Sequence, residues 1–280
     1  MTGRLSRRAV VGIPAIFSLA CRVRREPIPL ARDISYGSQV SQRLDVYAAT
    51  RRSSAGPAPV AVMVHGGGWI GGSRDEIAGF IPHLTSRGYV VANVGYRVAS
   101  EAVAPAAVED ARNAIEFVRS RSAEWGADSG RTLLIGFSAG AHLALLAALA
   151  PSEAIAGPQS RACGIVSFWG ITDVADLLEG PHMRDFARQW LPEGEGRLEL
   201  ARRLSPLSYD AAEAPDLCAV HSVRDDIVPF AHSERLVAKF RQAKRRARLI
   251  RLSHEGHAPP EKDYQAIFAE VFRFLDGKGA

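Results

Sequence analysis

Cysteine is scarce in this chain, with three residues in 280. Cys21, Cys163 and Cys218 are too few for a disulfide framework, and their spacing matches no metal-binding motif. Cys163 and Cys218 each lie in an apolar run typical of a core strand, so we expect both to be buried free thiols. The cysteine pattern therefore predicts neither a disulfide scaffold nor a metal site.

A strong excess of charge is also missing over most of the chain. The formal net charge is +5, but Arg4, Arg7 and Arg8 supply three of these charges within the first 20 residues, which contain no acid. A basic cluster at residues 241–248 follows an apparent helix, where cations favour the helix dipole, and no aromatic residues are interleaved with it. We therefore expect a solvated face there and no nucleic-acid partner.

Long apolar runs are absent too, and the longest one near the N-terminus covers only residues 9–20. Twelve residues are too few to span a bilayer, so with Arg7 and Arg8 before them they predict an export signal over residues 1–21 that resembles a twin-arginine signal. Ser18-Leu19-Ala20-Cys21 resembles a degenerate lipobox, and membrane contact is expected only if Cys21 is lipidated. Periplasmic, secreted and lipid-anchored locations remain open, as does a basic tail on a cytoplasmic enzyme.

The remaining chain has the pattern of one α/β domain. We expect a linker over residues 22–33 and a domain over residues 34–280, because a chain of this length and apolar content can bury one large core. Apolar strand-like runs alternate with amphipathic helical segments, which predicts a doubly wound, mostly parallel sheet with helices on both faces. Two edge strands are expected within residues 34–47, with a turn at Gly37-Ser38. The other expected strands cover residues 60–64, 89–94, 132–135, 164–169, 217–221 and 249–252, and the expected helices residues 76–87, 106–125, 142–149 and 264–275.

The segment that carries chemistry is Gly136-Phe137-Ser138-Ala139-Gly140, between an apolar strand and a helical segment. A G-x-S-x-G sequence in strand–turn–helix context is a nucleophile elbow, which exposes a strained serine to substrate. The motif alone is weak evidence, but its context is present here. Ser138 is therefore the candidate nucleophile, and it requires oxyanion donors, a general base and an orienting acid.

The oxyanion donors are expected after residues 60–64, where the chain reads His65-Gly66-Gly67-Gly68-Trp69. Glycines let backbone N–H groups point into a cleft without obstruction by side chains. We predict that the N–H groups of Gly67, Gly68 and Ala139 bind the oxyanion. His65 is interpreted as structural, because it precedes the nucleophile and would break the expected order of serine, acid and histidine.

The acid and the base follow in the required order. Asp225 comes after a short strand, at the edge of a parallel sheet where ligands bind, and His257 follows the last strand. Residues 174–214 lack sheet character and contain Gly180-Pro181 and several short amphipathic pieces, so we expect a small cap over the cleft, with a surface excursion of no function as the alternative.

Together these motifs resemble the α/β-hydrolase esterases of the hormone-sensitive-lipase-like and feruloyl-esterase-like group, which also contains the kynurenine formamidases. The resemblance covers residues 34–275 and rests on the glycine loop, the elbow and Gly256-His257. It rests also on Leu44-Asp45-Val46-Tyr47, on Tyr96-Arg97, on residues 105–110, and on the motif from His221 through Asp225 to Val228-Pro229. Ser222 and Phe137 depart from the pattern, since the group usually has glycine and a polar residue there. His142 matches a family histidine, which we interpret as a packing residue.

The resemblance implies a carboxylesterase that uses the triad Ser138, Asp225 and His257 on small-molecule esters of short or medium acyl or aryl type, without metal or organic cofactor. Formamidase or peptidase activity on the same triad is the alternative. A non-catalytic binding member of the fold is a further hypothesis, but all three triad residues are present. The sequence does not indicate the acyl group, the alcohol or the oligomeric state.

Overall fold

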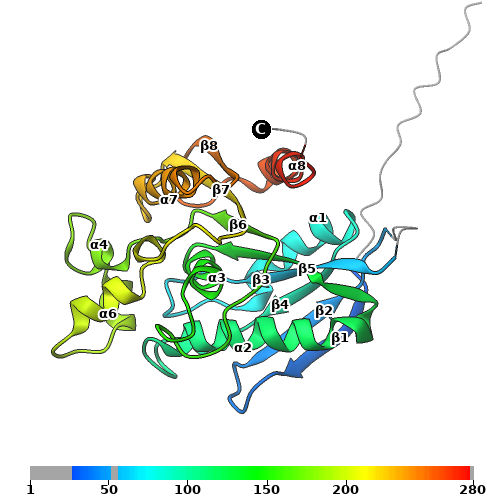
Figure 1. The fold of residues 1–280 in the computed structure, drawn as a ribbon, viewed down its shortest axis with the longest axis horizontal. Coiled ribbons are helices and arrows are strands. Elements are labelled where there is room, and N and C mark those ends of the chain that lie inside the picture. Colours follow the sequence, from blue (N-terminus) through cyan, green and yellow to red (C-terminus); the bar gives the residue numbers. More distant parts are fainter. Residues whose placement is uncertain (1–26, 52–55, 278–280) are drawn as a thin grey trace, which may run out of the picture.

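The computed structural model describes residues 27–51 and 56–277 (Figure 1). The predicted export segment, Cys21 included, lies outside these residues. Eight strands form one sheet in the order β1-β2-β4-β3-β5-β6-β7-β8. The strands are β1 (Pro29–Ser35), β2 (Arg43–Tyr47), β3 (Ala58–Val64), β4 (Val90–Val94), β5 (Ala127–Phe137), β6 (Gly164–Phe168), β7 (Asp216–Arg224) and β8 (Ala247–Glu255).

The sheet is parallel from β4 through β3, β5, β6 and β7 to β8, whereas β2 pairs antiparallel with both β1 and β4. This confirms the expected mostly parallel α/β sheet. One boundary differs, because β1 begins at Pro29 and pairs with Tyr47, so the last residues of the predicted 22–33 linker belong to the sheet. The two edge strands expected within residues 34–47 are β1 and β2, but the start of β1 at Pro29 was not predicted, because its residues are mostly exposed and lack apolar alternation.

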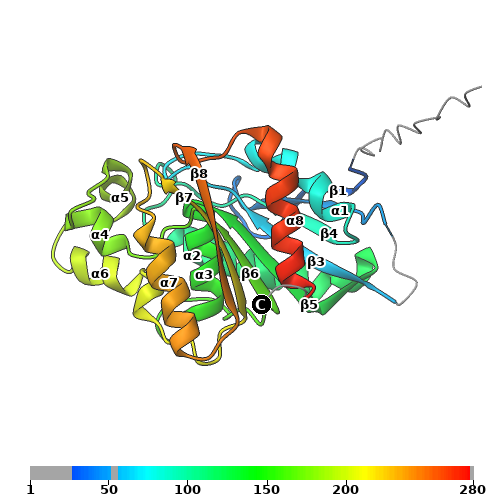
Figure 2. The same cartoon turned by 90° about the horizontal axis from the view of Figure 1, so that it is seen from above.

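Helices cover both faces of the sheet (Figures 1 and 2). On one face, α2 (Ala106–Arg121), α3 (Ala139–Leu149) and α7 (Ala231–Gln242) pack in one apolar cluster with strand residues such as Val60 and Val62. On the other face, Ala61 and Met63 contact a cluster that includes α1 (Ile81–Thr85) and α8 (Tyr264–Leu275). Successive residues of β3 thus point to opposite faces, as the pleat of a strand requires.

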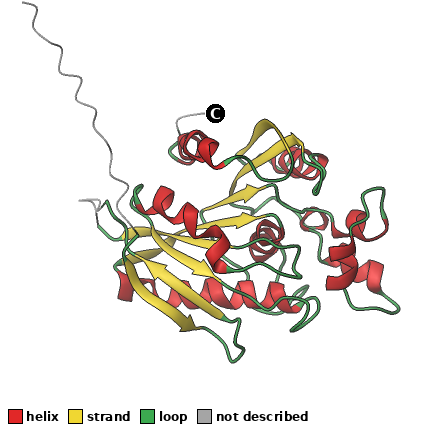
Figure 3. Ribbon diagram, turned by 180° about the vertical axis from the view of Figure 1, so that it is seen from behind, coloured by secondary structure: helices red, strands yellow, loops and turns green. Residues whose placement is uncertain are grey.

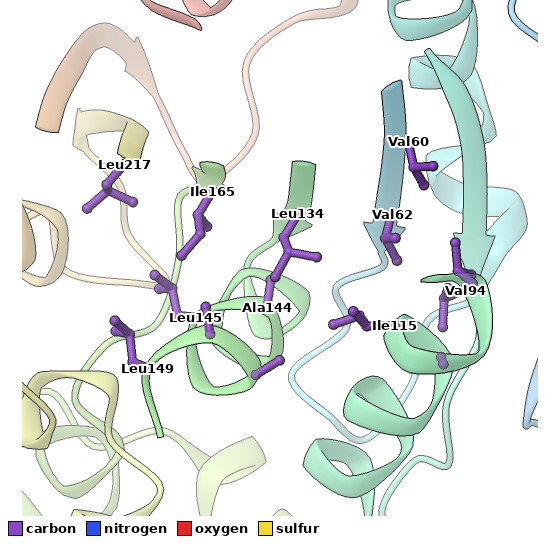
Figure 4. Packing of buried hydrophobic residues seen from close by; sticks show 14 of the residues in the cluster. Val60, Val62, Val94, Ile115, Leu134, Ala144, Leu145, Leu149, Ile165 and Leu217 are labelled. Carbon is purple, nitrogen blue, oxygen red and sulfur yellow. The ribbon is translucent and has the colours of Figure 1, made fainter. Parts of the chain in front are cut away.

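Apolar side chains fill the space between the sheet and its helices. Figure 4 shows Val62, Leu134 and Ile165, from three neighbouring strands, directed toward Leu145 of α3 and Ile115 of α2. All five side chains are at most 1% exposed. Burial on both faces explains why these strands are continuous apolar runs and not alternating ones.

The helix predicted over residues 76–87 is instead two short elements, the 3₁₀ helix η1 (Arg74–Phe80) and α1. Pro82 lies in the first turn of α1, where its missing N–H costs nothing, but it cannot continue a preceding helix. Further 3₁₀ turns are η2 (Ser122–Trp125), η3 (Pro206–Ser208) and η4 (Glu261–Asp263). In the described residues, no helix has the length and apolarity needed to cross a membrane.

Between β6 and β7 the chain forms α4 (Val174–Glu179), α5 (Asp185–Trp190) and α6 (Arg197–Arg203). Figures 1 and 3 show these helices grouped at one end of the sheet, beside the site described below. Their apolar side chains, including Leu177 and Trp190, belong to one buried cluster with Val64 of β3 and Leu143 of α3. The predicted insertion is therefore packed on the domain core and is called the cap from here on.

Candidate active site

Ser138 lies in the turn between β5 and α3 with φ 54° and ψ −117°, a conformation that L-residues rarely adopt. Its N–H donates to the carbonyl of Phe168 at the end of β6 (2.9 Å), and its carbonyl accepts from the N–H of His142 (3.2 Å). The turn is also tight against β3, since a Cβ at Gly140 would lie 2.2 Å from the carbonyl oxygens of both Val64 and His65. These contacts hold the strained serine at the carboxyl edge of the sheet.

The glycine loop follows β3 at the same edge. Gly67 has φ 105°, and a Cβ there would lie 2.2 Å from the carbonyl oxygen of Gly71, so only glycine fits. In the described part of the chain, the N–H groups of Gly67 and Gly68 donate to no other backbone or side-chain group. The N–H of Ala139 is at the first position of α3, where a helix leaves its donors unpaired. The three predicted oxyanion donors are therefore free to bind a ligand.

His65 supports this loop from behind. Its ring stacks on Tyr96 at 4.1 Å, and the Tyr96 hydroxyl donates to the carbonyls of His65 and Gly66 (3.1 and 3.2 Å). Burial lowers the pKa of His65 to about 4, so the ring is neutral at pH 7. Buried Asp110 then accepts from the backbone N–H and the guanidinium of Arg97 (2.7–2.9 Å), which fixes the segment after β4. His65 lies where a structural residue would, as predicted.

Asp225 directly follows β7, and its carboxylate is fully buried. Oδ2 accepts from Nδ1 of His257 at 2.7 Å and from Nε2 of His221 at 3.0 Å. Oδ1 accepts from the N–H groups of Ile227 and Val228, both at 2.9 Å. Burial acts to raise the pKa of Asp225, but the hydrogen bonds from the two histidines and from Val228 outweigh it and hold the pKa well below its usual range.

His257 lines the same pocket as Ser138, and its Nε2 is buried without a hydrogen-bond partner among the described residues. Its Nδ1 is already bound to Asp225, so Nε2 is the ring nitrogen left for proton transfer. His254 lies within β8 and is not among the described residues that form hydrogen bonds with the Asp225 carboxylate. The structure thus brings together the three residues predicted as the triad, although the triad assignment itself stays a prediction.

The pocket in front of Ser138 has a volume of about 400 Å³. Its walls are mostly aromatic and aliphatic, and Glu76 is the one carboxylate among the described residues that line it. The lining residues are Gly66, Gly67, Gly68, Ile70, Glu76, Ile77, Phe80, Phe137, Ser138, Trp169, Phe186, Ile227, His257, Ala258 and Tyr264. This volume suits a small ester, and the apolar walls suit an acyl chain or an aromatic ring.

The cap contributes directly to this pocket. Phe186 of α5 lines it and lies against Gly68, where a Cβ would come within 2.9 Å of the phenyl ring. Trp190 of α5 stacks on Trp69 of the glycine loop (4.2 Å), and the Trp69 indole N–H donates to Nδ1 of His142 (3.1 Å). Burial lowers the pKa of His142 to about 3, which leaves the ring neutral. His142 is therefore positioned as a packing and hydrogen-bonding residue, as we interpreted it.

Sequence reasoning missed several residues of the site. Phe186 and Glu76 line the pocket, but nothing in their local sequence separates them from other cap and helix residues. His221 was noted only as the start of the motif that contains Asp225, and its hydrogen bond to Asp225 was not predicted. Ser222, where the family usually has glycine, lies in β7 without a positive φ, and its hydroxyl donates to the carbonyl of His254.

One prediction about the cysteines was wrong. Cys163 is exposed and precedes β6, because the chain enters that strand only at Gly164. Cys218 is buried in β7 as expected, and burial raises the pKa of its thiol to about 12. The apolar run around Cys163 was a correct signal of a strand but did not locate its first residue.

Comparison with known proteins gives a family. The family model described as BD-FAE matches residues 44–240. Esterase LipQ of Mycobacterium tuberculosis is 29% identical over 221 residues, which cover 75% of this chain and 52% of LipQ. A probable isoprenylcysteine alpha-carbonyl methylesterase, ICMEL1 of Oryza sativa, is 31% identical over 81% of this chain and 57% of its own length. The chain thus spans little more than half the length of these relatives.

Solved structures agree in fold. Thermogutta terrifontis esterase 2, in a form phosphonylated by sarin, is 25% identical with a TM-score of 0.75 over 90% of this chain and 97% of its own. The same esterase with butyrate bound superposes with a TM-score of 0.72 at 23% identity, over 92% of this chain and 97% of its own. These structures and the family model confirm the α/β-hydrolase fold and the resemblance to esterases.

Proposed function

Because this chain belongs to the BD-FAE family, we propose that it is a serine hydrolase that cleaves carboxylic esters through an acyl-enzyme on Ser138. The observation that carries the proposal is the hydrogen bond of 2.7 Å between Asp225 Oδ2 and His257 Nδ1, which leaves His257 Nε2 unpartnered in the pocket that Ser138 also lines. A buried carboxylate, a histidine whose Nε2 has no partner among the described residues and a serine that lines the pocket are the parts that acyl transfer needs.

In the proposed mechanism, the Ser138 hydroxyl attacks the ester carbonyl while Nε2 of His257 accepts its proton. The negative charge of Asp225 stabilises the imidazolium that forms. The N–H groups of Gly67, Gly68 and Ala139 bind the oxyanion, and each such donor is worth about 3 kcal/mol in the transition state. The alcohol leaves with the proton from His257. Water then attacks the acyl-enzyme while His257 accepts its proton, and His257 returns this proton to Ser138 as the acid is released.

We further propose that the substrates have short or medium acyl groups or aryl groups. The pocket volume of about 400 Å³ and the walls formed by Phe80, Phe137 and Phe186 support this size and polarity. The cap, residues 174–214, is a short insertion, and its length suits a small lid over the pocket better than an extended lipid-binding surface.

A hydrolysis screen tests the function. Purified protein is assayed on p-nitrophenyl esters of increasing acyl length, on aryl esters, on emulsified long-chain triglyceride and on formamides, with Ser138→Ala as the control for background. We expect turnover of soluble acetyl to hexanoyl esters that Ser138→Ala abolishes. Faster turnover of triglyceride or of formamides than of every soluble ester would contradict the proposed substrate class.

The assignment of the acid and the base has its own test. Asp225→Ala and His257→Ala should each lower kcat by about three orders of magnitude or more, as losses from a triad do. Asp226→Ala and His254→Ala are matched controls that remove the same groups one and three residues away, and they should retain most of the activity. An inactive His254→Ala beside an active His257→Ala would overturn the assignment.

Export remains a proposal supported by Arg7 and Arg8 before the short apolar run. Fractionation of cells that express the full chain tests it, together with N-terminal analysis of the mature protein. We expect the processed protein outside the cytoplasm. Protein confined to the cytoplasm with residues 1–20 still attached would refute export, and an unmodified Cys21 would exclude the lipid anchor.

A further inference from the structure

The carboxylate of Asp225 accepts four hydrogen bonds, two on each oxygen. Oδ1 is bound by the backbone N–H groups of Ile227 and Val228, which belong to the same loop as Asp225. Oδ2 is bound by His257, the base of the proposed function, and by His221. His221 is therefore the one donor in this set that comes from the sheet and not from the loops of the site.

His221 is held rigidly. It lies in β7, which is paired on both sides with parallel strands, β6 and β8, and its side chain is fully buried. Its Nε2 lies 3.0 Å from Asp225 Oδ2 and 3.1 Å from the Val228 carbonyl. Both of these partners accept hydrogen bonds, so Nε2 must carry a proton.

The other ring nitrogen of His221 has a different partner. Nδ1 lies 2.7 Å from the hydroxyl of Ser233, at the start of α7, and accepts from that hydroxyl when the ring is neutral. The ring also packs edge-on against Phe230 (5.7 Å). Ser233 and Phe230 thus fix both the tautomer and the orientation of the ring, which aims the Nε2–H at the carboxylate.

We propose that His221 is a positioning residue for catalysis: it holds Asp225 against the sheet and shares the carboxylate oxygen that binds His257, so that Asp225 keeps His257 aligned. The inference rests on the proposed function, since it assumes that His257 is the general base. It adds a fourth residue to the predicted triad, which acts through Asp225 and does not touch the substrate.

The direction in which loss of His221 shifts the pH profile follows because His221 and His257 share Oδ2 of Asp225. Without the donor from His221, the negative charge of Asp225 is less neutralised and stabilises the His257 imidazolium more strongly. Activity is then lost at a higher pH on the acidic side of the profile, because proton transfer needs the neutral ring of His257. The other ionisable groups nearby remain unchanged, namely Arg184 from the cap on the carbonyls of Asp226 and Ile227, the Arg224–Glu255 pair, and His232 of α7.

Two substitutions separate positioning from simple packing. In His221→Gln, the side-chain amide nitrogen can occupy the place of Nε2 and still donate to Asp225. In His221→Asn, the shorter amide can reach only the place of Nδ1, near Ser233. Both variants are neutral and polar, so a difference between them reports on the hydrogen bond to Asp225.

The experiment measures kcat, KM and the pH profile of kcat/KM on p-nitrophenyl butyrate, with folded enzyme counted from the burst of p-nitrophenol. For His221→Asn we expect kcat to fall about tenfold at unchanged KM and the acidic limb to move up by about 0.5 pH unit, which corresponds to a partial loss of one hydrogen bond to a charged group. For His221→Gln we expect the wild-type limb and most of the wild-type kcat.

Three outcomes would overturn the inference. They are a wild-type limb in His221→Asn, equal shifts in both variants, or a loss of thermal stability with unchanged kcat per folded molecule. If His221→Asn does not fold, His221→Gln decides alone, since a shifted limb in that variant contradicts the proposal and a wild-type limb supports it. A wild-type enzyme without activity on any ester would instead refute the proposed function, which is a separate result.

Discussion

Gly140→Ala should damage stability and catalysis together. A Cβ at Gly140 would lie 2.2 Å from the carbonyl oxygens of Val64 and His65, about 1 Å closer than a carbon and an oxygen can pack. Both obstacles are backbone at the end of β3, so no side-chain rotation relieves the clash, and α3 must move away from the strand by most of that distance. Overpacking of this kind costs about 1–3 kcal/mol, or about 3–9 °C in Tm for a domain of this size.

The same displacement separates Ser138 from the glycine loop, because Gly140 is two residues after the serine and His65 is two residues before Gly67. A misplacement of about 1 Å between reacting groups costs about a hundredfold in rate. We therefore expect kcat per folded molecule to fall by about that factor, beyond any loss through unfolding.

The assay combines thermal unfolding with kcat and KM on p-nitrophenyl butyrate, normalised to folded protein. Gly79→Ala is the matched control, because a Cβ at Gly79 meets nothing within 4 Å. It should leave both kcat and Tm close to those of the wild type. If Gly140→Ala kept its Tm within about 1 °C and its kcat within about threefold, the argument from close packing at the elbow would be refuted.

Further predictions concern charge, pH and a buried cation. Glu76→Gln should raise kcat/KM about threefold for an ester with an anionic acyl group and leave a neutral ester unchanged, because Glu76 lines the pocket and forms no ion pair with a described residue. Asp75→Asn, at a residue that does not line the pocket, should change neither value. Burial lowers the pKa of His65 to about 4 and of His142 to about 3 from an ordinary value of 6.5, so the unfolded chain binds more protons at acidic pH. The free energy of unfolding, measured with urea, should therefore be highest above pH 6.5 and fall steadily between pH 6.5 and 4, and a flat profile would contradict this. Buried Arg112 donates to four carbonyls and to no acid, so Arg112→Met should lower the free energy of unfolding by about 3 kcal/mol in urea melts without changing kcat per folded molecule.

The parts of the site that the sequence predicted are those where the backbone admits few residue types. Gly67 has a positive φ, and an added Cβ at either Gly67 or Gly140 would lie 2.2 Å from a backbone oxygen. Only glycine fits these positions, so the motifs can be recognised in a single sequence. The order of Ser138, Asp225 and His257 follows from the parallel sheet, which places the carboxyl ends of β5, β7 and β8 at one edge. The fold and the catalytic chemistry could therefore both be inferred from the sequence, because the backbone of the parallel sheet constrains both.

Residues whose role depends on long-range packing were not predicted. Phe186 enters the pocket because α5 is held by Trp190 on Trp69, a contact across more than a hundred residues. No local pattern distinguishes Phe186 from an ordinary core aromatic residue. The start of the edge strand β1 at Pro29 was missed for a related reason, since its pairing with β2 does not depend on buried side chains.

The cap and the glycine loop form one packed unit, which has a consequence for how substrate preference can vary. Phe186 contacts Gly68, an expected oxyanion donor, and Trp190 stacks on the next residue, Trp69. A substitution in α5 that changes the pocket walls must therefore also alter the support of the oxyanion donors. Acyl preference and kcat should change together in cap variants, whereas they should vary independently for Tyr264, which lines the pocket from α8 on the other side of the sheet.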